Sequence, residues 1–451
     1  MTKTMSSQKA GLPPIFYLFA GLLLFILVPK LGGLLPLSGN DPRVSTGALQ
    51  LDKNNTNPDK ERAIAAIAKG DTKQGEEFLQ KSLARDPNDP ESVIYLNNLQ
   101  TGDNPLKIAV VVPVGNNSNI AREMLRGVAS AQGQINAQGG INGRKLAVTI
   151  VNDDNNPDIA REMAGKLVQD PDIVAVIGHN ASDASLAAAP VYQKGGLVMV
   201  SPTSFANNLS GAGNYIFRVV PPSSTIADAL GARIVNTAKI RKIAFCYDSQ
   251  AADNVSFKDE LMASVAKKGG QIVPIVCDVT APNFDASDAV EKAISAGATG
   301  LFVSAHVDRL DPVFKVIQAD RGRLALFSSP TLYNIKTLQE GGEAAKGLTL
   351  VAPWHPSVNP TFANQMKEQW RGPVSWRTAT SFDTTKTIAA GLKQNPTRGG
   401  LQSVLRSPNF RADGATGTIR FDPGTGDRVG QPVLLQVQPS SSGYQFVSLP
   451  R

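Results

Sequence analysis

The segments KIAVVVPV at 107–114, KLAVTIVND at 145–153 and DIVAVIG at 172–178 decide the fold class. Each is short, apolar and rich in β-branched residues, which is typical of strands buried on both faces of a sheet. Helical patterns at 120–137 and 157–169 separate them. Buried strands joined by helices predict a parallel sheet with helices covering both faces.

The same alternation continues toward the C-terminus. We expect further strands at 196–201, 242–248, 271–279, 300–305, 324–329 and 347–353, and further helices at 182–194, 224–237, 256–268, 285–296 and 311–321. A single core rarely grows beyond roughly 250–300 residues. The sequence therefore predicts an α/β fold of two doubly wound parallel-sheet lobes with a cleft between them.

The composition is that of a folded globular protein. Hydrophobic residues make up 42% and charged residues 18% of the 451 residues, which excludes a disordered, collagen-like or coiled-coil chain. Lys and Arg (45) exceed Asp and Glu (38), but this excess is spread thinly along the chain. Because basic runs interleaved with aromatic residues are missing, we expect no nucleic-acid partner.

The N-terminus carries an uncharged apolar segment, IFYLFAGLLLFILV at 15–28, after Lys3 and Lys9. We expect residues 1–38 to form an uncleaved signal anchor that spans the membrane, with a cleaved secretory signal as the alternative. In either case the protein faces the periplasmic or extracytoplasmic side, and the uncleaved anchor holds it at the inner membrane. The polar segment 39–58 is expected to be a linker.

Residues 59–105 show helical patterns interrupted by turns. Gly70-Asp71, Phe78, Leu83 and Asp86-Pro87-Asn88 resemble one tetratricopeptide-like unit. Such repeats need stacked neighbours, and only one copy is found. We therefore expect a helical spacer, or a unit that packs on the next domain, rather than a peptide-binding array.

Cys246 and Cys277 each end a short apolar run, so we expect both to be buried in neighbouring strands. A disulfide between them is one outcome in an oxidising compartment, and two free thiols are the other.

Small polar loops follow the expected strands. Ligands of open α/β sheets bind beyond the carboxyl ends of the strands. In the first lobe these loops contain Asn117, Ser182 and the sequence Thr203-Ser204-Phe205. We expect Ser182 and the N–H groups around Thr203 and Ser204 to hold an anionic or carbonyl group, with helix capping as the alternative role of Ser182.

The corresponding loops of the second lobe contain Asp248, His306 and Thr331. Asp253, a little further along, is placed in the same wall of the cleft. The motifs of nucleophilic hydrolases and of nucleotide-binding loops are missing, and the three histidines are far apart in the sequence. We therefore expect no enzymatic activity, no cofactor and no metal.

Several short motifs in a fixed order carry a family resemblance. They include Gly139-Gly140-Ile141-Asn142-Gly143-Arg144, Asp153-Asp154, Ser201-Pro202, Tyr215-Ile216-Phe217-Arg218 and Phe421-Asp422-Pro423-Gly424. Together they resemble the type I periplasmic binding proteins, specifically the branched-chain amino-acid receptors of ABC importers, over about 107–438. The resemblance implies two lobes joined by three crossovers, a small-molecule solute, and an ABC permease or a membrane sensor as partner.

The resemblance also implies domain limits and ligand positions. The binding domain would span 106–451, with lobe 1 at about 106–220 and 355–420, lobe 2 at about 224–352, and a C-terminal crossover segment at 421–451. Crossings are expected near 219–224, near 352–357 and after Phe421. The expected ligand-binding residues are Asn117, Ser182, Thr203, Ser204, Phe205, Asp248, Asp253, His306 and Thr331.

The carried-over site departs from the family pattern in two places. Phe205 stands where the family usually has a Thr that accepts from the ligand's amino group, and Thr331 lies where an acidic residue would neutralise that group. Asp253 or Asp308 could take over the second role. A free α-amino acid, another small polar or anionic solute, and a scaffold that has lost ligand binding all remain open, and an exported α/β enzyme is the less favoured alternative.

Overall fold

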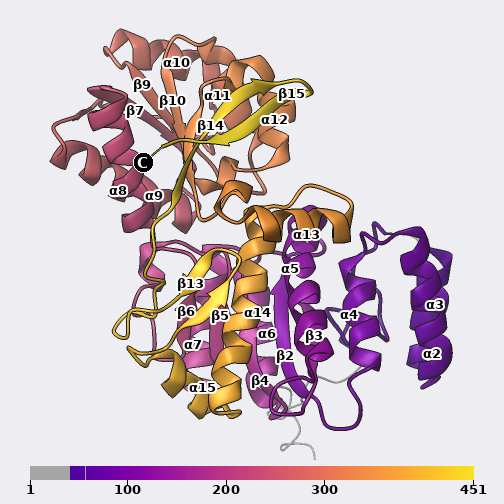
Figure 1. The fold of residues 1–451 in the computed structure, drawn as a ribbon. Helices are drawn as coiled ribbons and strands as arrows, with labels where there is room; N and C mark the ends of the chain where they lie inside the picture. Colours follow the sequence, from indigo (N-terminus) through magenta and orange to yellow (C-terminus); the bar gives the residue numbers. More distant parts are fainter. Residues whose placement is uncertain (1–40, 56, 451) are drawn as a thin grey trace, which may run out of the picture.

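The computed structural model describes residues 41–55 and 57–450 (Figure 1). The expected anchor at 1–38, with its apolar segment 15–28, lies outside the described residues. None of the helices in the described part of the chain combines the length and the apolar character needed to cross a membrane.

The lower lobe in Figure 1, lobe 1, is built on a sheet with the strand order β1-β3-β2-β4-β5-β6. Every neighbouring pair is parallel except β1–β3. Along β2, Ile108 and Val110 pack on one face, and Ala109 and Val111 pack on the other. The bounds are β1 (Val44–Ser45), β2 (Leu106–Val112), β3 (Leu146–Asn152), β4 (Ile173–Ile177), β5 (Val198–Ser201) and β6 (Ile216–Arg218).

Helices from two distant parts of the chain cover this sheet. α6 (Pro157–Gln169) and α7 (Ser182–Gly195) pack on one face, and α5 (Ser118–Ala137) lies on the other. α14 (Trp376–Gln394) lies beside α5, and α15 (Arg398–Leu405) packs against α14; both come from the C-terminal quarter of the chain. The sheet therefore has both faces covered, as its near-continuous apolar strands predict.

The upper lobe, lobe 2, has a sheet with the order β15-β14-β11-β10-β9-β7-β8. The strands from β8 to β11 pair in parallel, and β14 and β15 add an antiparallel edge. The bounds are β7 (Lys242–Tyr247), β8 (Gln271–Ile272), β9 (Gly300–Ser304), β10 (Ala325–Ser328), β11 (Thr349–Ala352), β14 (Val433–Ser440) and β15 (Gly443–Ser448). Its helices are α8 (Ser223–Ala232), α9 (Ala252–Lys267), α10 (Ala286–Ser295), α11 (Asp311–Asp320) and α12 (Ile335–Gly341).

The described chain passes between the lobes three times. The crossings lie between β6 and α8, between β11 and α13 (Pro360–Trp370), and between the pair β12 (Ala412–Gly414) and β13 (Gly417–Ile419) and β14. Just before the last crossing, the Asp427 carboxylate accepts a 2.6 Å hydrogen bond from Arg218 Nε in lobe 1. The mostly parallel two-lobed α/β fold predicted from the strand pattern is confirmed.

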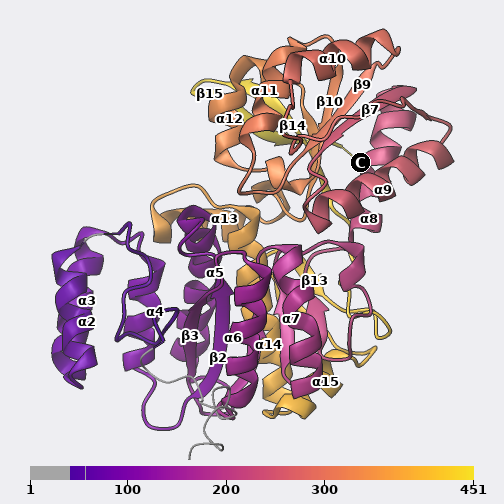
Figure 2. The same cartoon turned by 180° about the vertical axis from the view of Figure 1, so that it is seen from behind.

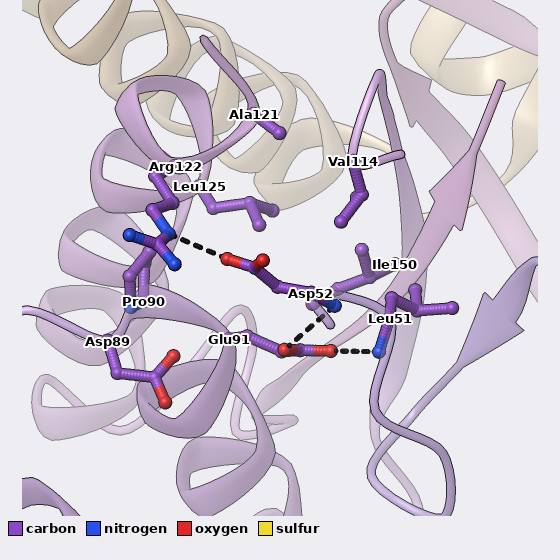
Figure 3. A pocket seen from close by; sticks show the side chains of 10 residues that line it. All are labelled: Leu51, Asp52, Asp89, Pro90, Glu91, Val114, Ala121, Arg122, Leu125 and Ile150. Atoms are coloured by element: carbon purple, nitrogen blue, oxygen red, sulfur yellow. Dashed lines mark hydrogen bonds and ion pairs between the residues drawn. The ribbon is translucent and has the colours of Figure 1, made fainter. Parts of the chain in front are cut away.

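Helices α2 (Pro58–Ala68), α3 (Thr72–Arg85) and α4 (Pro90–Leu99) form a small unit beside lobe 1, and α4 packs against α5 (Figure 2). The buried Lys60 ammonium lies 2.9 Å from the Asp89 carboxylate and 2.7 Å from that of Glu91. Figure 3 shows how the preceding segment joins this unit to lobe 1. Glu91 accepts from Leu51 N at 2.7 Å, and Asp52 pairs with Arg122 of α5 at 2.6 Å.

Several elements differ from the expectations. Part of the segment 39–58, expected to be a linker, forms β1 because its backbone pairs with the edge strand β3. β8 covers 271–272, whereas a strand over 271–279 was expected. Cys246 lies in β7, and Cys277 lies beyond β8 in the segment that runs beside β7; both are buried and joined by a disulfide.

Candidate ligand-binding site between the lobes

A small cavity lies where the two lobes meet. Its lining residues are Asn180, Ala181, Ser182, Thr203 and Phe205 from lobe 1, Asp253, His306, Val307 and Thr331 from lobe 2, and Trp376 and Arg377 from the start of α14. The cavity has a volume of about 20 Å³, which is room for about one water molecule. The two lobes therefore lie close together around this cavity.

The lobe 1 wall is the N-terminus of α7. Its N-cap residue, Ala181, offers no side-chain acceptor, and Ser182 is the first helical residue, so Ser182 does not take the capping role considered for it. Ser182 Oγ accepts a 3.3 Å hydrogen bond from Ala206 N, and its own hydrogen has no acceptor within residues 41–55 and 57–450. This hydroxyl and the positive end of the helix are suited to an anion.

The loop after β5, which contains Thr203 and Ser204, is stabilised mainly by hydrogen bonds within lobe 1. The backbone N–H groups of Thr203 and Ser204 both donate to Ser201 Oγ, at 3.3 and 3.0 Å. They are therefore engaged within the loop, whereas the sequence suggested that they would face a ligand. Thr203 Oγ1 donates to Asn180 O at 2.8 Å, and Ser204 Oγ lies 2.8 Å from Ser185 Oγ, behind the lining.

The lobe 2 wall contains a buried carboxyl group. Asp253 lies in the first turn of α9, and its Oδ1 accepts from Asn254 N and Asn254 Nδ2, both at 2.9 Å. Burial raises the pKa of Asp253, while His306 acts in the opposite direction. Thr331, also on the lining, has its Oγ1 2.6 Å from Ser329 Oγ. A cationic group of a ligand would find its counter-charge at Asp253.

Three residues expected in the site lie outside the cavity lining, namely Asn117, Ser204 and Asp248. Asn117 caps α5, and its Nδ2 donates to Asp308 Oδ1 at 2.7 Å. Asp248 is fully buried in lobe 2, where its Oδ2 accepts from His306 N at 3.1 Å and from Arg309 Nη2 at 2.8 Å.

Asp308 connects the two lobes. Its Oδ1 accepts from Asn117 Nδ2 and its Oδ2 accepts from Asn155 Nδ2 at 2.9 Å, so one lobe 2 carboxylate is held by two lobe 1 amides. A second contact joins α7 to α9, because Asp183 Oδ2 accepts from Ala252 N at 3.2 Å. These polar contacts stabilise the closed arrangement.

The sequence did not point to Trp376 and Arg377, the first two residues of α14. The Arg377 side chain is only 3% exposed, its Nη1 lies 3.3 Å from Glu123 Oε2, and its guanidinium carbon lies 4.5 Å from the centre of the Trp376 ring. Burial lowers the pKa of Arg377, and Glu123 opposes that shift. The only local signal was Ser375, an N-cap residue whose side chain accepts from Thr378 N.

Among the residues that the structure describes, no group of three or more His, Cys, Asp or Glu side chains is arranged to hold a metal ion.

Residues 105–443 match the family model described as "Periplasmic binding protein". The Leu/Ile/Val-binding protein of Escherichia coli (strain K12) is 24% identical over 325 residues, covering 70% of this chain and 86% of that protein. A leucine-binding protein structure from Thermotoga maritima shares 19% identity with a TM-score of 0.68, covering 76% of this chain and 97% of that one. A solute-binding protein of an ABC transporter from Rhodopseudomonas palustris BisB5, in complex with 3,4-dihydroxy benzoic acid, shares 18% identity with a TM-score of 0.67, covering 77% and 97%.

Proposed function

We propose that this chain, which belongs to the periplasmic binding protein family, closes its two lobes on a small carboxylate-bearing solute and presents that solute to an ABC permease. The family consists of binding proteins rather than enzymes. The observation that carries the proposal is the cavity between the lobes, where the N-terminus of α7 and the Ser182 hydroxyl lie opposite the Asp253 carboxyl.

The solutes named for similar proteins support a ligand that carries a carboxylate group. The relative from Escherichia coli is a Leu/Ile/Val-binding protein, one similar structure contains Leu, and another contains 3,4-dihydroxy benzoic acid. All of these solutes carry a carboxylate, and only the amino acids also carry an ammonium group. In our proposal the solute carboxylate accepts from Ser182 Oγ and from the first N–H groups of α7, and an amino group lies against Asp253.

We also propose that the protein works on the extracytoplasmic side, held at the inner membrane by residues 1–38. The helical unit of α2–α4 then forms an extension of lobe 1, because Asp52 and Glu91 connect it to that lobe. Cell fractionation tests this directly. Recovery of the protein from the membrane fraction, accessible to protease from the periplasmic side, is the expected result, and a cytoplasmic location would contradict it.

Ligand binding is tested by thermal shift and calorimetry on the purified protein. The panel contains aliphatic and acidic L-amino acids, benzoates and dicarboxylates. At a ligand concentration 100 times Kd, stabilisation should reach about 2.7 kcal/mol, which is readily seen as a rise in Tm. If no member binds, the proposal fails.

That negative result would favour a second candidate function, a scaffold of the same fold without a ligand. Two observations favour this candidate: the cavity lined by Ser182 and Asp253 has room for only about one water molecule, and Phe205 stands where the resemblance implies a Thr.

A further inference from the structure

Two hydrogen-bond donors at the cavity lack an acceptor anywhere in the described chain. They are Nε of Arg377 and Nε1 of Trp376, and both side chains line the cavity between the lobes. Both residues are buried, with 3% and 2% of their surface exposed. Buried donors almost always have partners in folded proteins, so this pair indicates a group that the structure does not contain.

The chemistry of these two side chains specifies what that group must be. Arg and Trp side chains donate hydrogen bonds and accept none, so both need an acceptor. The guanidinium also carries a positive charge, and its fork of N–H groups matches a carboxylate. A hydrocarbon side chain placed here would leave both donors unpaired and would bury the cation against apolar atoms.

The surrounding residues hold the guanidinium in place. Glu123, which is not on the cavity lining, contacts Nη1 at 3.3 Å, and the Trp376 ring stacks on the guanidinium. Glu123 is therefore a positioning residue, and Arg377 Nε is left without a partner among the described residues. The N-terminus of α14 lies at the same place, which adds to the positive potential there.

We infer that Arg377 and Trp376 bind an acidic group on the side chain of the solute, so that the ligand is an acidic α-amino acid rather than a branched-chain one. This rests on the proposed function, in which Ser182 and α7 hold the α-carboxylate and Asp253 faces the ammonium. The three subsites then match the three charges of aspartate or glutamate, and a ligand of this size enters when the lobes open.

Calorimetry on the full chain tests the inference with L-aspartate, L-glutamate, L-leucine and L-isoleucine. Each bond to a charged group changes affinity by roughly tenfold to a hundredfold. We expect the better acidic ligand to bind at least tenfold more tightly than leucine. Arg377→Gln should weaken its binding by about ten- to a hundredfold, whereas the same change at the exposed Arg420 should leave it unchanged.

Trp376→Phe keeps the ring stack and removes only the N–H group, so it carries the test if Arg377→Gln fails to fold. It should weaken binding of the acidic ligand several-fold and leave leucine binding unchanged.

Tighter binding of leucine or isoleucine than of either acidic amino acid overturns the inference and leaves the proposed function standing. Equal losses for acidic and aliphatic ligands in Trp376→Phe also overturn it. If none of the four ligands nor any other carboxylate binds, the proposed function fails, and the inference fails with it.

Discussion

Ser182 is the residue where ligand binding and fold stability can be separated most cleanly. Ser182→Ala should weaken binding of the identified carboxylate about ten- to a hundredfold, because the hydroxyl donates to a charged group. The free energy of unfolding should change by less than about 1 kcal/mol, since Ser182 is not the N-cap residue of α7. Calorimetry and urea unfolding measure the two effects.

The neighbouring Ser204→Ala is the matched control. Ser204 Oγ lies within hydrogen-bonding distance of Ser185 Oγ behind the lining, so its loss should lower stability and leave affinity almost unchanged. The opposite pattern in the two variants would remove Ser182 from the site.

Site residues that follow a strand could be selected from the sequence, and site residues that follow no strand could not. Ser182 and Thr331 follow apolar runs, and both line the cavity. Arg377 follows no strand, so the rule that ligands bind at carboxyl ends of strands does not reach it. Ser204 also follows a strand, but its side chain contacts Ser185 and does not line the cavity. Its position after a strand does not determine the direction in which its side chain points.

At the scale of elements, the disulfide between Cys246 of β7 and Cys277 should hold part of lobe 2 together. The two cysteines are 31 residues apart, and closing a loop of that length reduces the freedom of the unfolded chain by about 3–4 kcal/mol. The double variant Cys246→Ala, Cys277→Ala should therefore unfold at a lower urea concentration. Thiol titration of the unfolded, unreduced protein should find no free thiol, and two free thiols would contradict the bond.

The helical unit should depend on Glu91. Its carboxylate pairs with the buried Lys60, and it accepts from Leu51 N and from Tyr95 Oη, each at 2.7 Å. Glu91→Ala should cost about 3 kcal/mol or more, because it leaves a buried ammonium with one partner fewer. Circular dichroism during urea unfolding measures this cost. Glu77→Ala, at an exposed position of α3, should have little effect, and equal stability of both variants would contradict the prediction.

Most strands and helices between 107 and 353 could be predicted because their apolar residues follow clear periods, whereas β6, α12 and the short extent of β8 were not predicted. α14 could not be predicted, because it is buried on nearly every side and six of its fifteen buried residues are Thr or Ser. Thr380, Thr384 and Thr385 satisfy their hydroxyls by donating to the carbonyl four residues earlier. Such a helix has no apolar stripe, so its sequence shows no helical period.

At the scale of the whole molecule, Asp308 should set the balance between open and closed lobes. Asp308→Ala removes the contacts to Asn117 and Asn155 and so lowers the population of the closed state. Affinity should fall several-fold in proportion to that population. Small-angle scattering without ligand should show a larger radius of gyration. Asp311→Ala, which loses only a surface pair with Lys336 within lobe 2, is the control, and identical scattering of the two variants would contradict the role of Asp308.

The three crossings also determine when the protein can finish folding. A nascent chain that has reached Arg377 already contains every residue of the cavity lining. Lobe 1 then still lacks most of α14 and the Asp427 partner of Arg218, and lobe 2 still lacks β14, which covers the edge of β11. Because each lobe takes residues from this later part of the chain, lobe 1 cannot complete its core before α14 and Asp427 are synthesised, and lobe 2 cannot complete its sheet before β14 is synthesised. All residues of the binding site are therefore synthesised well before the two lobes that bring them together can finish folding.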